Sequence, residues 1–321
     1  MATITWLMLG LLLMCCGISR SVEGAYMDVE GLGKVDSTFA EGSPCLSPDP
    51  EQRCFAGCKH IFMDLGSNIG MHARFLFEPN HYNQSRYSSL IFDKMFSSQK
   101  ERTKACMIGW EPNPEHKDRL RKLSAYLKKK NFRADWIFAG VSSTNRNISF
   151  VHANTKMDLR NEEWGFSRVP HSPAKKKAPV RTTYEEIMAM DISLFIHQHI
   201  PNINKYDGKP HLTDPTIIMK MDVEAEEYRI VPKMIATGVY CRISVLTMEW
   251  HGSKFSKENP SAPIGRSENA LKAVMWKIGR DELCKNTTVI NVDDESYVRD
   301  SKWGRNTLRG TDIASNTTAG K

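Results

Sequence analysis

The sequence predicts an α/β fold, a doubly wound and mostly parallel sheet, on two observations. Short apolar runs alternate with amphipathic segments of helical length between residues 58 and 300, which is the pattern of strand–helix–strand units in a parallel sheet. The first apolar run also ends in a glycine-containing turn, Asp64-Leu65-Gly66-Ser67-Asn68-Ile69-Gly70. Such a turn lets a buried strand pass into a helix whose N-terminus faces a ligand, so it indicates a nucleotide-like cofactor without specifying which one.

Strands are predicted where an apolar run of roughly four to eight residues stands between turn-forming residues, because strands buried on both faces of a parallel sheet are continuously apolar. The runs predicted for the central sheet are Lys59–Asp64, Ala105–Trp110, Trp136–Val141, Thr216–Met221 and Val245–Glu249. Two further runs predict an added strand at Ile148–His152 and a terminal hairpin that joins Val289–Val292 to Ser296–Val298.

Helices are predicted from apolar residues at helical spacing and from capping residues. Three of them span Met71–Phe77, Glu115–Lys130 and Ser267–Leu283, and an acidic helix start follows the fourth strand. Another helix is predicted at Thr183–Met190, because Thr182 or Thr183 can cap it and Glu185 or Glu186 would fall in its first turn. The stretches between these elements that are predicted as insertions or loops are residues 78–104, with a helical patch near Leu90–Phe96, 153–181 and 197–215.

The two ends of the chain differ in composition from its middle. Ile4–Ile18 is an almost unbroken apolar run followed by small and polar residues, which predicts a signal peptide over residues 1–24, with an uncleaved signal anchor as the alternative. Residues 25–57 are then an irregular lead-in, 58–300 the folded domain and 301–321 a disordered tail. We therefore expect the chain in the secretory pathway, with no membrane span once the signal is cleaved.

Sequons and cysteines agree with that compartment. Asn-x-Ser/Thr sequons occur at Asn83, Asn147, Asn286 and Asn316, and the cysteines beyond the signal peptide are Cys45, Cys54, Cys58, Cys106, Cys241 and Cys284. In an oxidising compartment these cysteines are candidates for disulfides. The sequence does not fix their pairing, although a bond from Cys45 to Cys54 or Cys58 would staple the segment before the first strand.

The net charge of +7 is mild and dispersed. Two lysine clusters, Lys128–Lys130 and Lys175–Lys177, are predicted at a helix end and in a proline-flanked loop. They are interpreted as solvated surface, with an acidic glycan or a membrane headgroup as the alternative partner. Aromatic residues do not interleave with these lysines, so no nucleic-acid partner is expected, and the pattern does not indicate an oligomeric state.

Glu111 follows the second apolar run, where a nucleotide cofactor needs an acidic residue for its ribose hydroxyls. Its distance from the glycine turn is more than twice the usual spacing of about 20 residues, and the insertion at residues 78–104 accounts for the difference. A surface turn before Pro112 is the alternative interpretation. Asn68 stands where a dinucleotide fingerprint would have glycine, and the chain has no G-x-G-x-x-G, which disfavours NAD.

Charged residues gather after the fourth and fifth predicted strands. Lys220 and Asp222 lie two residues apart, so they point to the same side of their strand, and Glu224 follows them. Glu249 and His251 follow the fifth strand. Ligands bind at this edge of open α/β sheets, which makes these five residues the candidate catalytic group, with His251 as a possible general base. A self-neutralising Lys220–Asp222 pair and a structural histidine are the alternatives.

Together these motifs resemble the FkbM-type methyltransferases. The segments that carry the resemblance occur in the family's order and cover most of residues 59–251: Phe62–Gly70, Glu111-Pro112-Asn113-Pro114, Thr183-Tyr184-Glu185-Glu186, Lys220–Glu227 and Met248–His251. The resemblance implies a seven-stranded, Rossmann-like class I fold with S-adenosyl-L-methionine as cofactor, and typically O-methyltransferase activity. The family's Lys-x-Asp-x-Glu-Gly-x-Glu pattern is matched except that Ala225 stands in place of the glycine, and alanine would crowd the turn if the backbone there needs positive φ.

The resemblance also assigns roles to individual residues. The methionine and ribose side of the cofactor would be lined by Asp64, Gly66, Asn68 and Gly70, and Glu111 would bind the ribose hydroxyls. Ser67 and Asn113 are further cofactor-binding candidates. The adenine would lie against Val141 and Ser142, where no acidic residue stands. The transferred methyl group would be surrounded by Asp222, Glu224, Glu249 and His251. Three carboxylates there could alternatively hold a divalent metal that lowers the pKa of the acceptor hydroxyl, a cofactor that we do not predict.

The expected activity is therefore methylation of a hydroxyl on a small molecule, glycan or lipid in the secretory pathway, with the acceptor bound by the insertions. A secreted binding protein that retains the fold without turnover is the alternative, motivated by Ala225 and by a compartment into which the cofactor must be imported. A lumenal glycosyltransferase is a weaker alternative, because it would carry an Asp-x-Asp metal motif that this chain lacks.

Overall fold

The computed structural model describes residues 55–82, 85, 87–153, 166, 182–200, 215–252, 268–280, 284 and 287–291. All of them fall in the unit Gly42–Lys321. The predicted signal peptide, nearly all of the lead-in, the tail and most of the two later loops lie outside the described residues, as do the sequons at Asn83, Asn286 and Asn316. The remaining sequon residue, Asn147, is exposed on a strand.

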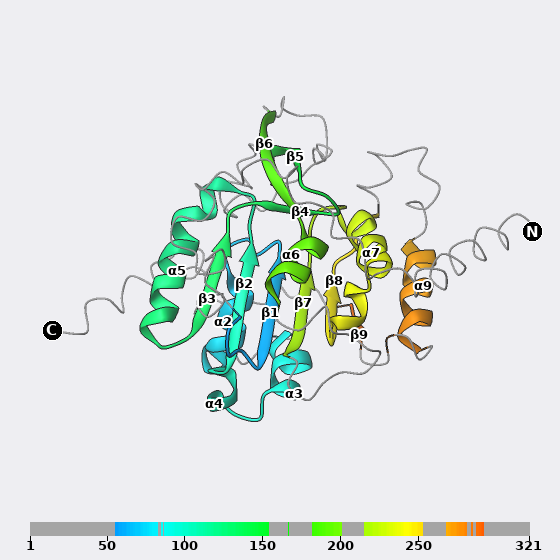
Figure 1. Cartoon of the computed structure of the whole chain (residues 1–321). Helices are drawn as coiled ribbons and strands as arrows, with labels where there is room; N and C mark the ends of the chain where they lie inside the picture. The colour runs from blue at the N-terminus through cyan, green and yellow to red at the C-terminus, as the bar shows by residue number, and fades with distance from the viewer. Residues whose placement is uncertain are drawn as a thin grey trace, which may run out of the picture. The chain divides into compact units, whose positions relative to one another are not determined.

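Parallel pairing of the apolar runs builds the central sheet. Its described strands are β1 (His60–Leu65), β2 (Ala105–Trp110), β3 (Arg133–Ile137), β7 (Thr216–Met221), β8 (Val245–Met248) and β9 (Thr288–Ile290). They lie in the order β3-β2-β1-β7-β8-β9, and every neighbouring pair is parallel (Figure 1). The order reverses between β1 and β7, which makes the sheet doubly wound, as predicted, and opens a crevice at the carboxyl ends of those two strands. The described part of this sheet has six strands, so a seventh stays a prediction.

Helices cover both faces of this sheet. The helices that matter for the site are α2 (Met71–Phe77), α5 (Lys117–Lys129), α6 (Ile192–His199) and α7 (Glu227–Ala236), and α9 (Glu268–Arg280) follows later in the chain. Figure 1 shows α6 in front of the sheet and α2 behind it. On the α6 face, the ring centroid of Trp110 lies 4.9 Å from that of Phe195. Successive strand residues point to opposite faces, so the continuously apolar strands meet a helix on each side.

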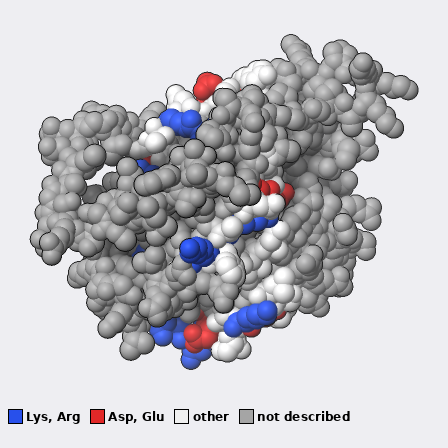
Figure 2. Space-filling view, turned by 90° about the vertical axis from the view of Figure 1, so that its right-hand side faces the viewer, with Lys and Arg blue, Asp and Glu red and all other residues white. Residues whose placement is uncertain are grey.

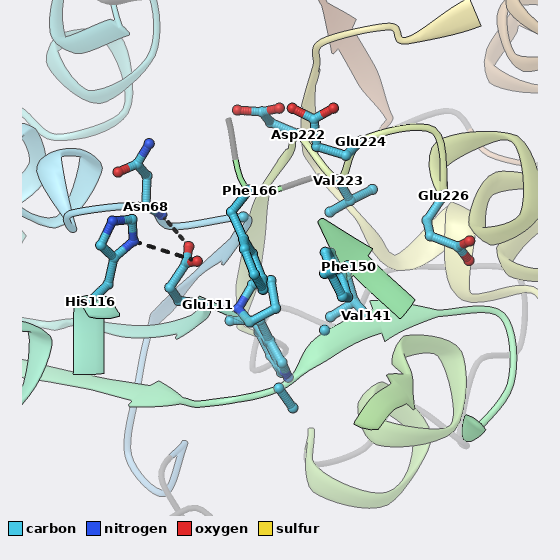
Figure 3. Close-up of a pocket in the computed structure, with 15 residues that line it drawn as sticks. Asn68, Glu111, His116, Val141, Phe150, Phe166, Asp222, Val223, Glu224 and Glu226 are labelled. Carbon is cyan, nitrogen blue, oxygen red and sulfur yellow. Dashed lines mark hydrogen bonds and ion pairs between the residues drawn. The ribbon is translucent and has the colours of Figure 1, made fainter. Parts of the chain in front are cut away.

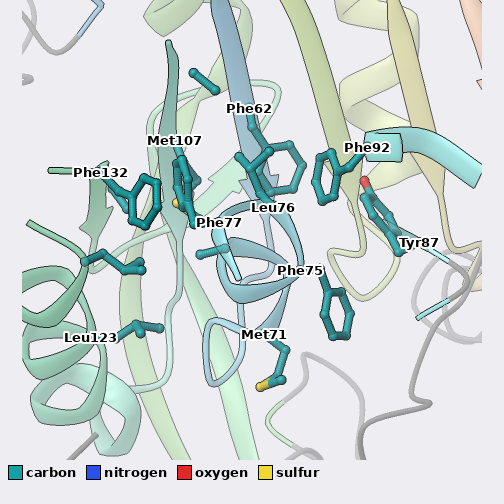
Figure 4. Packing of buried hydrophobic residues seen from close by; sticks show 14 of the residues in the cluster. Phe62, Met71, Phe75, Leu76, Phe77, Tyr87, Phe92, Met107, Leu123 and Phe132 are labelled. Atoms are coloured by element: carbon teal, nitrogen blue, oxygen red, sulfur yellow. The ribbon is translucent and has the colours of Figure 1, made fainter. Parts of the chain in front are cut away.

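The α2 face holds the larger described cluster of buried apolar residues. Phe62 of β1 packs edge-on against Phe92 with ring centroids 5.2 Å apart, and Phe77 stacks on Phe132 at 4.7 Å. Figure 4 shows these rings together with Met107 of β2 and Leu123 of α5. Phe92 ends a π-helical turn, Ser88–Phe92, which is followed by the short helices α3 (Asp93–Met95) and α4 (Gln99–Arg102). The insertion at residues 78–104 therefore contributes to the core and also carries the predicted helical patch.

The predicted helix Thr183–Met190 is wrong, because these residues form the strand β6 (Thr182–Asp191). It pairs antiparallel with β5 (Arg146–Ala153) and parallel with β4 (Gly140–Ser142) in a second sheet of order β4-β6-β5. Cross-strand pairing decides the conformation here, and threonine suits a strand as well as a helix cap. The helix cap lies further along the chain, where the carboxylate of Asp191 accepts a 3.0 Å hydrogen bond from Leu194 N and begins α6.

Two other predicted strands need correction. The run Trp136–Val141 is divided, because β3 ends at Ile137 and the chain enters the second sheet as β4 at Gly140. The run at Val289–Val292 contributes to β9, which pairs in parallel with β8 and so belongs to the central sheet. The second half of the predicted hairpin lies outside the described residues.

Two disulfides are present among the described cysteines. Cys58–Cys106 joins the segment before β1 to β2, and Cys241–Cys284 joins the segment before β8 to the one before β9. The predicted option of a bond between Cys45 and Cys58 is therefore wrong, whereas Cys45 and Cys54 lie outside the described residues. Disulfides are typical of proteins that fold in an oxidising compartment.

Charges of both signs share the described surface. In the face that Figure 2 presents, Lys and Arg side chains lie next to Asp and Glu side chains. On α9, for example, Lys272 Nζ lies 2.5 Å from Glu268 Oε1. Of the helices that the structure describes, none has the length and apolarity needed to cross a bilayer.

Candidate functional site

A pocket lies at the carboxyl ends of the central strands, beside the point where the strand order reverses. The residues that line it are Gly66, Asn68, Trp110, Glu111, Pro112, His116, Ala139, Gly140, Val141, Phe150, Phe166, Asp222, Val223, Glu224 and Glu226 (Figure 3). They come from the end of β2, from the segments that follow β1, β2, β3 and β7, and from the second sheet, with Phe166 between β5 and β6. The predicted residues that take part in this lining are Gly66, Asn68, Glu111, Val141, Asp222 and Glu224.

Gly66 lets the ends of β1 and β7 meet. Its φ is +82°, and a Cβ at this position would lie 1.9 Å from the carbonyl oxygen of Asp222. Only glycine fits there. Gly70 has φ of +80°, and its Cβ would meet the Leu123 side chain at 2.7 Å, so this glycine serves the packing of α5 and does not line the pocket.

Glu111 ties the glycine turn to the end of β2. Its Oε2 accepts a hydrogen bond from Asn68 N at 2.5 Å, and its Oε1 accepts one from Asn113 N at 2.9 Å. His116, which sequence reasoning missed, places Nδ1 3.5 Å from Oε1. Figure 3 shows Asn68 above His116 on one side of this carboxylate, with a dashed line from each to it. Glu111 therefore holds the turn and also presents a carboxylate to the pocket.

The far end of the pocket, here called the aromatic end, consists of Val141, Phe150 and Phe166. The two phenylalanine rings stack with centroids 4.9 Å apart and an interplanar angle of 3°. Phe150 comes from β5 and Val141 from β4, so the second sheet forms this wall. The run Ile148–His152 was predicted only as a strand, and its place beside the pocket follows from the fold.

An acidic residue does stand near the aromatic end, which corrects the sequence prediction. Glu226 is 1% exposed, and its Oε2 accepts a 2.6 Å hydrogen bond from Ser142 Oγ. Arg146 and Arg229 donate to its Oε1 at 3.0 and 2.9 Å. Ser142 is thus committed to Glu226 and does not line the pocket. The two residues are 84 positions apart, and no local pattern indicates such a pair.

Asp64 and Lys220 lie side by side under the pocket. They are register partners on β1 and β7, and Asp64 is fully buried with Oδ1 3.8 Å from Lys220 Nζ. Lys220 donates to the carbonyl oxygen of Gly66 at 2.7 Å and to Asp222 Oδ2 at 3.0 Å. Burial raises the pKa of Asp64 to about 7, although the Lys220 charge opposes the shift. Neither residue lines the pocket, and the hydroxyl of Ser67 donates to the backbone oxygen of Asp64. The Asp64–Lys220 pair therefore supports the turn from below.

Carboxylates surround His251 at the ends of β7 and β8. Its Nδ1 lies 2.7 Å from Glu227 Oε1, and its Nε2 lies 3.4 Å from Glu249 Oε1. The distances from Nε2 to Asp222 Oδ1 and Glu224 Oε1 are 3.7 and 3.9 Å. Burial by itself would lower the pKa of His251, but hydrogen bonds and charges of Glu227, Glu249 and Asp222 outweigh it and raise the pKa to about 10. The ring is therefore protonated at neutral pH and is not a general base in this state.

The turn between β7 and α7 has an unusual backbone. Glu224 and Ala225 both adopt positive φ, at 56° and 85°, and Ala225 is fully buried. A non-glycine residue in this region is strained by about 1–3 kcal/mol. Glycine would adopt this conformation without that strain.

One ligand atom from each of Asp222, Glu224 and His251 lies within 4.8 Å of the other two. A divalent ion could bind at such a spacing, but partly exposed acidic groups are common without one, so a metal stays the alternative. Comparisons with known proteins found no matching family model, no matching curated protein and no matching solved structure. The likeness to FkbM-type methyltransferases therefore remains a resemblance of motifs.

Proposed function

We propose that the chain is an S-adenosyl-L-methionine-dependent methyltransferase that acts on a hydroxyl of a small molecule, glycan or lipid in the secretory pathway. One observation carries this proposal. The pocket combines an aromatic end, the carboxylate of Glu111 and the paired carboxylates of Asp222 and Glu224. We call those two carboxylates the pocket mouth.

The residues present fit the proposed cofactor region by region. The flat apolar walls of Val141 and Phe150 suit an adenine, and Glu111 suits the vicinal hydroxyls of a ribose. The anionic pocket mouth suits a positively charged sulfonium. The other residues that were predicted to bind the cofactor lie outside the lining. Asn113 holds Glu111 and Ser142 holds Glu226 through hydrogen bonds, whereas Asp64, Ser67 and Gly70 belong to the end of β1 and the turn after it.

The chain's own residues would then do three things. When bound, the cofactor supplies a methyl group on a positively charged sulfur, and that charge disappears as the acceptor oxygen takes the methyl group. The pocket walls hold the reacting groups in place, which is a large part of many rate enhancements. Asp222 and Glu224 are the lining carboxylates that can accept the hydroxyl proton. Lys220 orients Asp222 through its 3.0 Å hydrogen bond.

The test is incubation of the purified protein with methyl-labelled S-adenosyl-L-methionine and fractionated host extracts, followed by identification of the labelled product. We expect label in an ether-linked methyl group, and loss of it in Asp222→Asn. Asp135→Asn is the matched control, because Asp135 pairs with Lys128 and lies outside the pocket lining. Label in protein amines or carboxyls would contradict the hydroxyl acceptor.

Ala225 favours a second candidate, a secreted binding protein that keeps the fold without turnover. Its backbone is strained at φ 85° in the turn that presents Glu224 to the pocket. Cofactor binding without methyl transfer to any fraction would support this candidate over the enzyme.

A further inference from the structure

Glu227 and His251 form a buried pair beside the pocket. Glu227 begins α7 and is fully buried, and its Oε1 lies 2.7 Å from Nδ1 of His251. The same oxygen accepts a 3.2 Å hydrogen bond from Val223 N. The backbone therefore fixes the carboxylate, and the carboxylate in turn contacts one defined nitrogen of the ring.

The other ring nitrogen faces the two strand ends. Nε2 lies between 3.4 and 3.9 Å from one oxygen each of Glu249, Asp222 and Glu224. Asp222 and Glu224 form the pocket mouth, whereas Glu227 and His251 are outside the lining. Like charges this close repel one another unless a cation lies between them. Lys220 already supplies one cation to Asp222, and the ring nitrogen is placed to supply a second one between the three carboxylates.

We propose that Glu227 is a positioning residue: its hydrogen bond to Nδ1 orients His251 so that Nε2–H gathers Asp222, Glu224 and Glu249 at the pocket mouth. A carboxylate on one ring nitrogen is a general means of fixing which nitrogen a histidine presents. The inference rests on the proposed function only for the reaction that the gathered carboxylates serve. The orientation itself is a property of the cofactor-free protein.

Two substitutions separate positioning from packing. Glu227→Gln keeps an oxygen that can accept from Nδ1–H, whereas Glu227→Leu removes the acceptor at similar volume. Glu78 offers a matched control, because it is also buried and bonded to Arg74, Tyr126 and Lys130. Glu78→Leu removes a buried carboxylate at a place that does not line the pocket.

The first readout is the side-chain nitrogen spectrum of His251 in cofactor-free protein labelled with 15N-histidine. We expect a hydrogen-bonded Nδ1–H signal in the wild type and a signal at a changed chemical shift in Glu227→Gln. In Glu227→Leu this signal should be lost, and the chemical shifts of both ring nitrogens should change. The spectrum of Glu78→Leu should match the wild type. An unchanged His251 spectrum in Glu227→Gln or Glu227→Leu overturns the proposal. If Glu227→Leu does not fold, the Glu227→Gln spectrum alone decides.

The second readout is kinetic. Misplacement of the pocket-mouth carboxylates should lower kcat of Glu227→Leu by about 10- to 100-fold, with the Kd of S-adenosyl-L-methionine within about twofold of wild type because Glu111 is intact. Glu227→Gln should recover most of the rate. Equal losses in Glu227→Leu and Glu78→Leu at equal stability overturn the proposal. If the wild type binds no S-adenosyl-L-methionine, the proposed function fails while the ring spectra still decide the role of Glu227.

Discussion

The turns after β1 and β7 meet where the strand order reverses, and both contain residues with positive φ. The two turns differ in which residue types adopt that conformation. After β1 the residues with positive φ are Gly66, Asn68 and Gly70, whereas after β7 they are Glu224 and Ala225. Glycine and asparagine adopt this region at little cost, and glutamate and alanine do not. The glycine turn is thus free of backbone strain, and Gly66 allows the ends of β1 and β7 to approach each other closely. The turn after β7 is strained, and strain of this kind is retained where it places functional side chains.

The turn after β7 distributes three glutamates to three places. Glu224 lines the pocket, Glu226 accepts hydrogen bonds from Ser142 and Arg146 of the second sheet, and Glu227 contacts His251. α7 begins only at Glu227, so the two positive-φ residues before Glu226 set how the chain enters the helix. One strained turn therefore connects the pocket mouth, the aromatic end and His251.

Of the substitutions that test the two turns, Gly66→Ala should have the largest effect on the stability of the protein. Its Cβ would meet the Asp222 carbonyl oxygen at 1.9 Å as well as strain φ, so we expect a loss on the order of 3–5 kcal/mol in unfolding free energy. Urea unfolding measures it. Gly238→Ala is the matched control, since its φ is +75° with no atom within 4 Å, and it should lose only about 1 kcal/mol. Equal losses would show that contact with Asp222 is unimportant.

Glu111→Gln tests the glycine turn as a cofactor site. An amide NH2 would oppose one of the two backbone N–H donors that now point at the carboxylate. We expect the affinity for S-adenosyl-L-methionine to fall by about 10- to 100-fold, as for a lost hydrogen bond to a charged group. Glu115→Gln, an exposed neighbour, should bind normally in the same calorimetric titration. Unchanged affinity in Glu111→Gln would exclude Glu111 from the cofactor contact.

The pH dependence of stability tests the charges around the strained turn. The pKa of His251 is raised from 6.5 to about 10 in the folded protein. Its stabilising contribution is therefore complete below pH 6.5 and is lost as the pH rises towards 10. Between those limits the wild type should lose on the order of 2 kcal/mol more than His251→Gln. Parallel curves for the two proteins would contradict the charged state of the ring.

Ala225→Gly should have the smallest effect on stability, and it should stabilise the protein where the other substitutions destabilise it or weaken binding. Removing Cβ relieves the strain at φ 85°, so we expect a gain of up to about 1 kcal/mol after the larger entropy of the unfolded glycine chain is subtracted. Thermal unfolding measures it. Ala73→Gly within α2 should instead lose about 1 kcal/mol. Destabilisation by Ala225→Gly would show that the turn is not strained.

The sequence predicts well those parts of the fold whose conformation depends on a short stretch of neighbouring residues. β2 and β7 have the predicted bounds because continuous apolar runs of that length fit only a buried strand. The helix prediction at β6 is wrong because pairing with β5, whose residues lie 29 to 43 positions earlier, outweighs the cap and acidic-turn signals. In the site, the glycine turn and Glu111 were predicted from motifs. The contact of Glu226 with Ser142 joins residues 84 positions apart, and the stacking of Phe166 on Phe150 depends on the second sheet, so no short pattern encodes either. His116 lies in the turn that follows Glu111, but no motif marks it.

Calorimetric titration of the purified, disulfide-bonded protein with S-adenosyl-L-methionine tests the central claim most directly. We expect saturable binding of one cofactor per chain, accompanied by a rise in Tm because the ligand binds the folded state. A titration with no heat at several temperatures, together with an unchanged Tm, would contradict it.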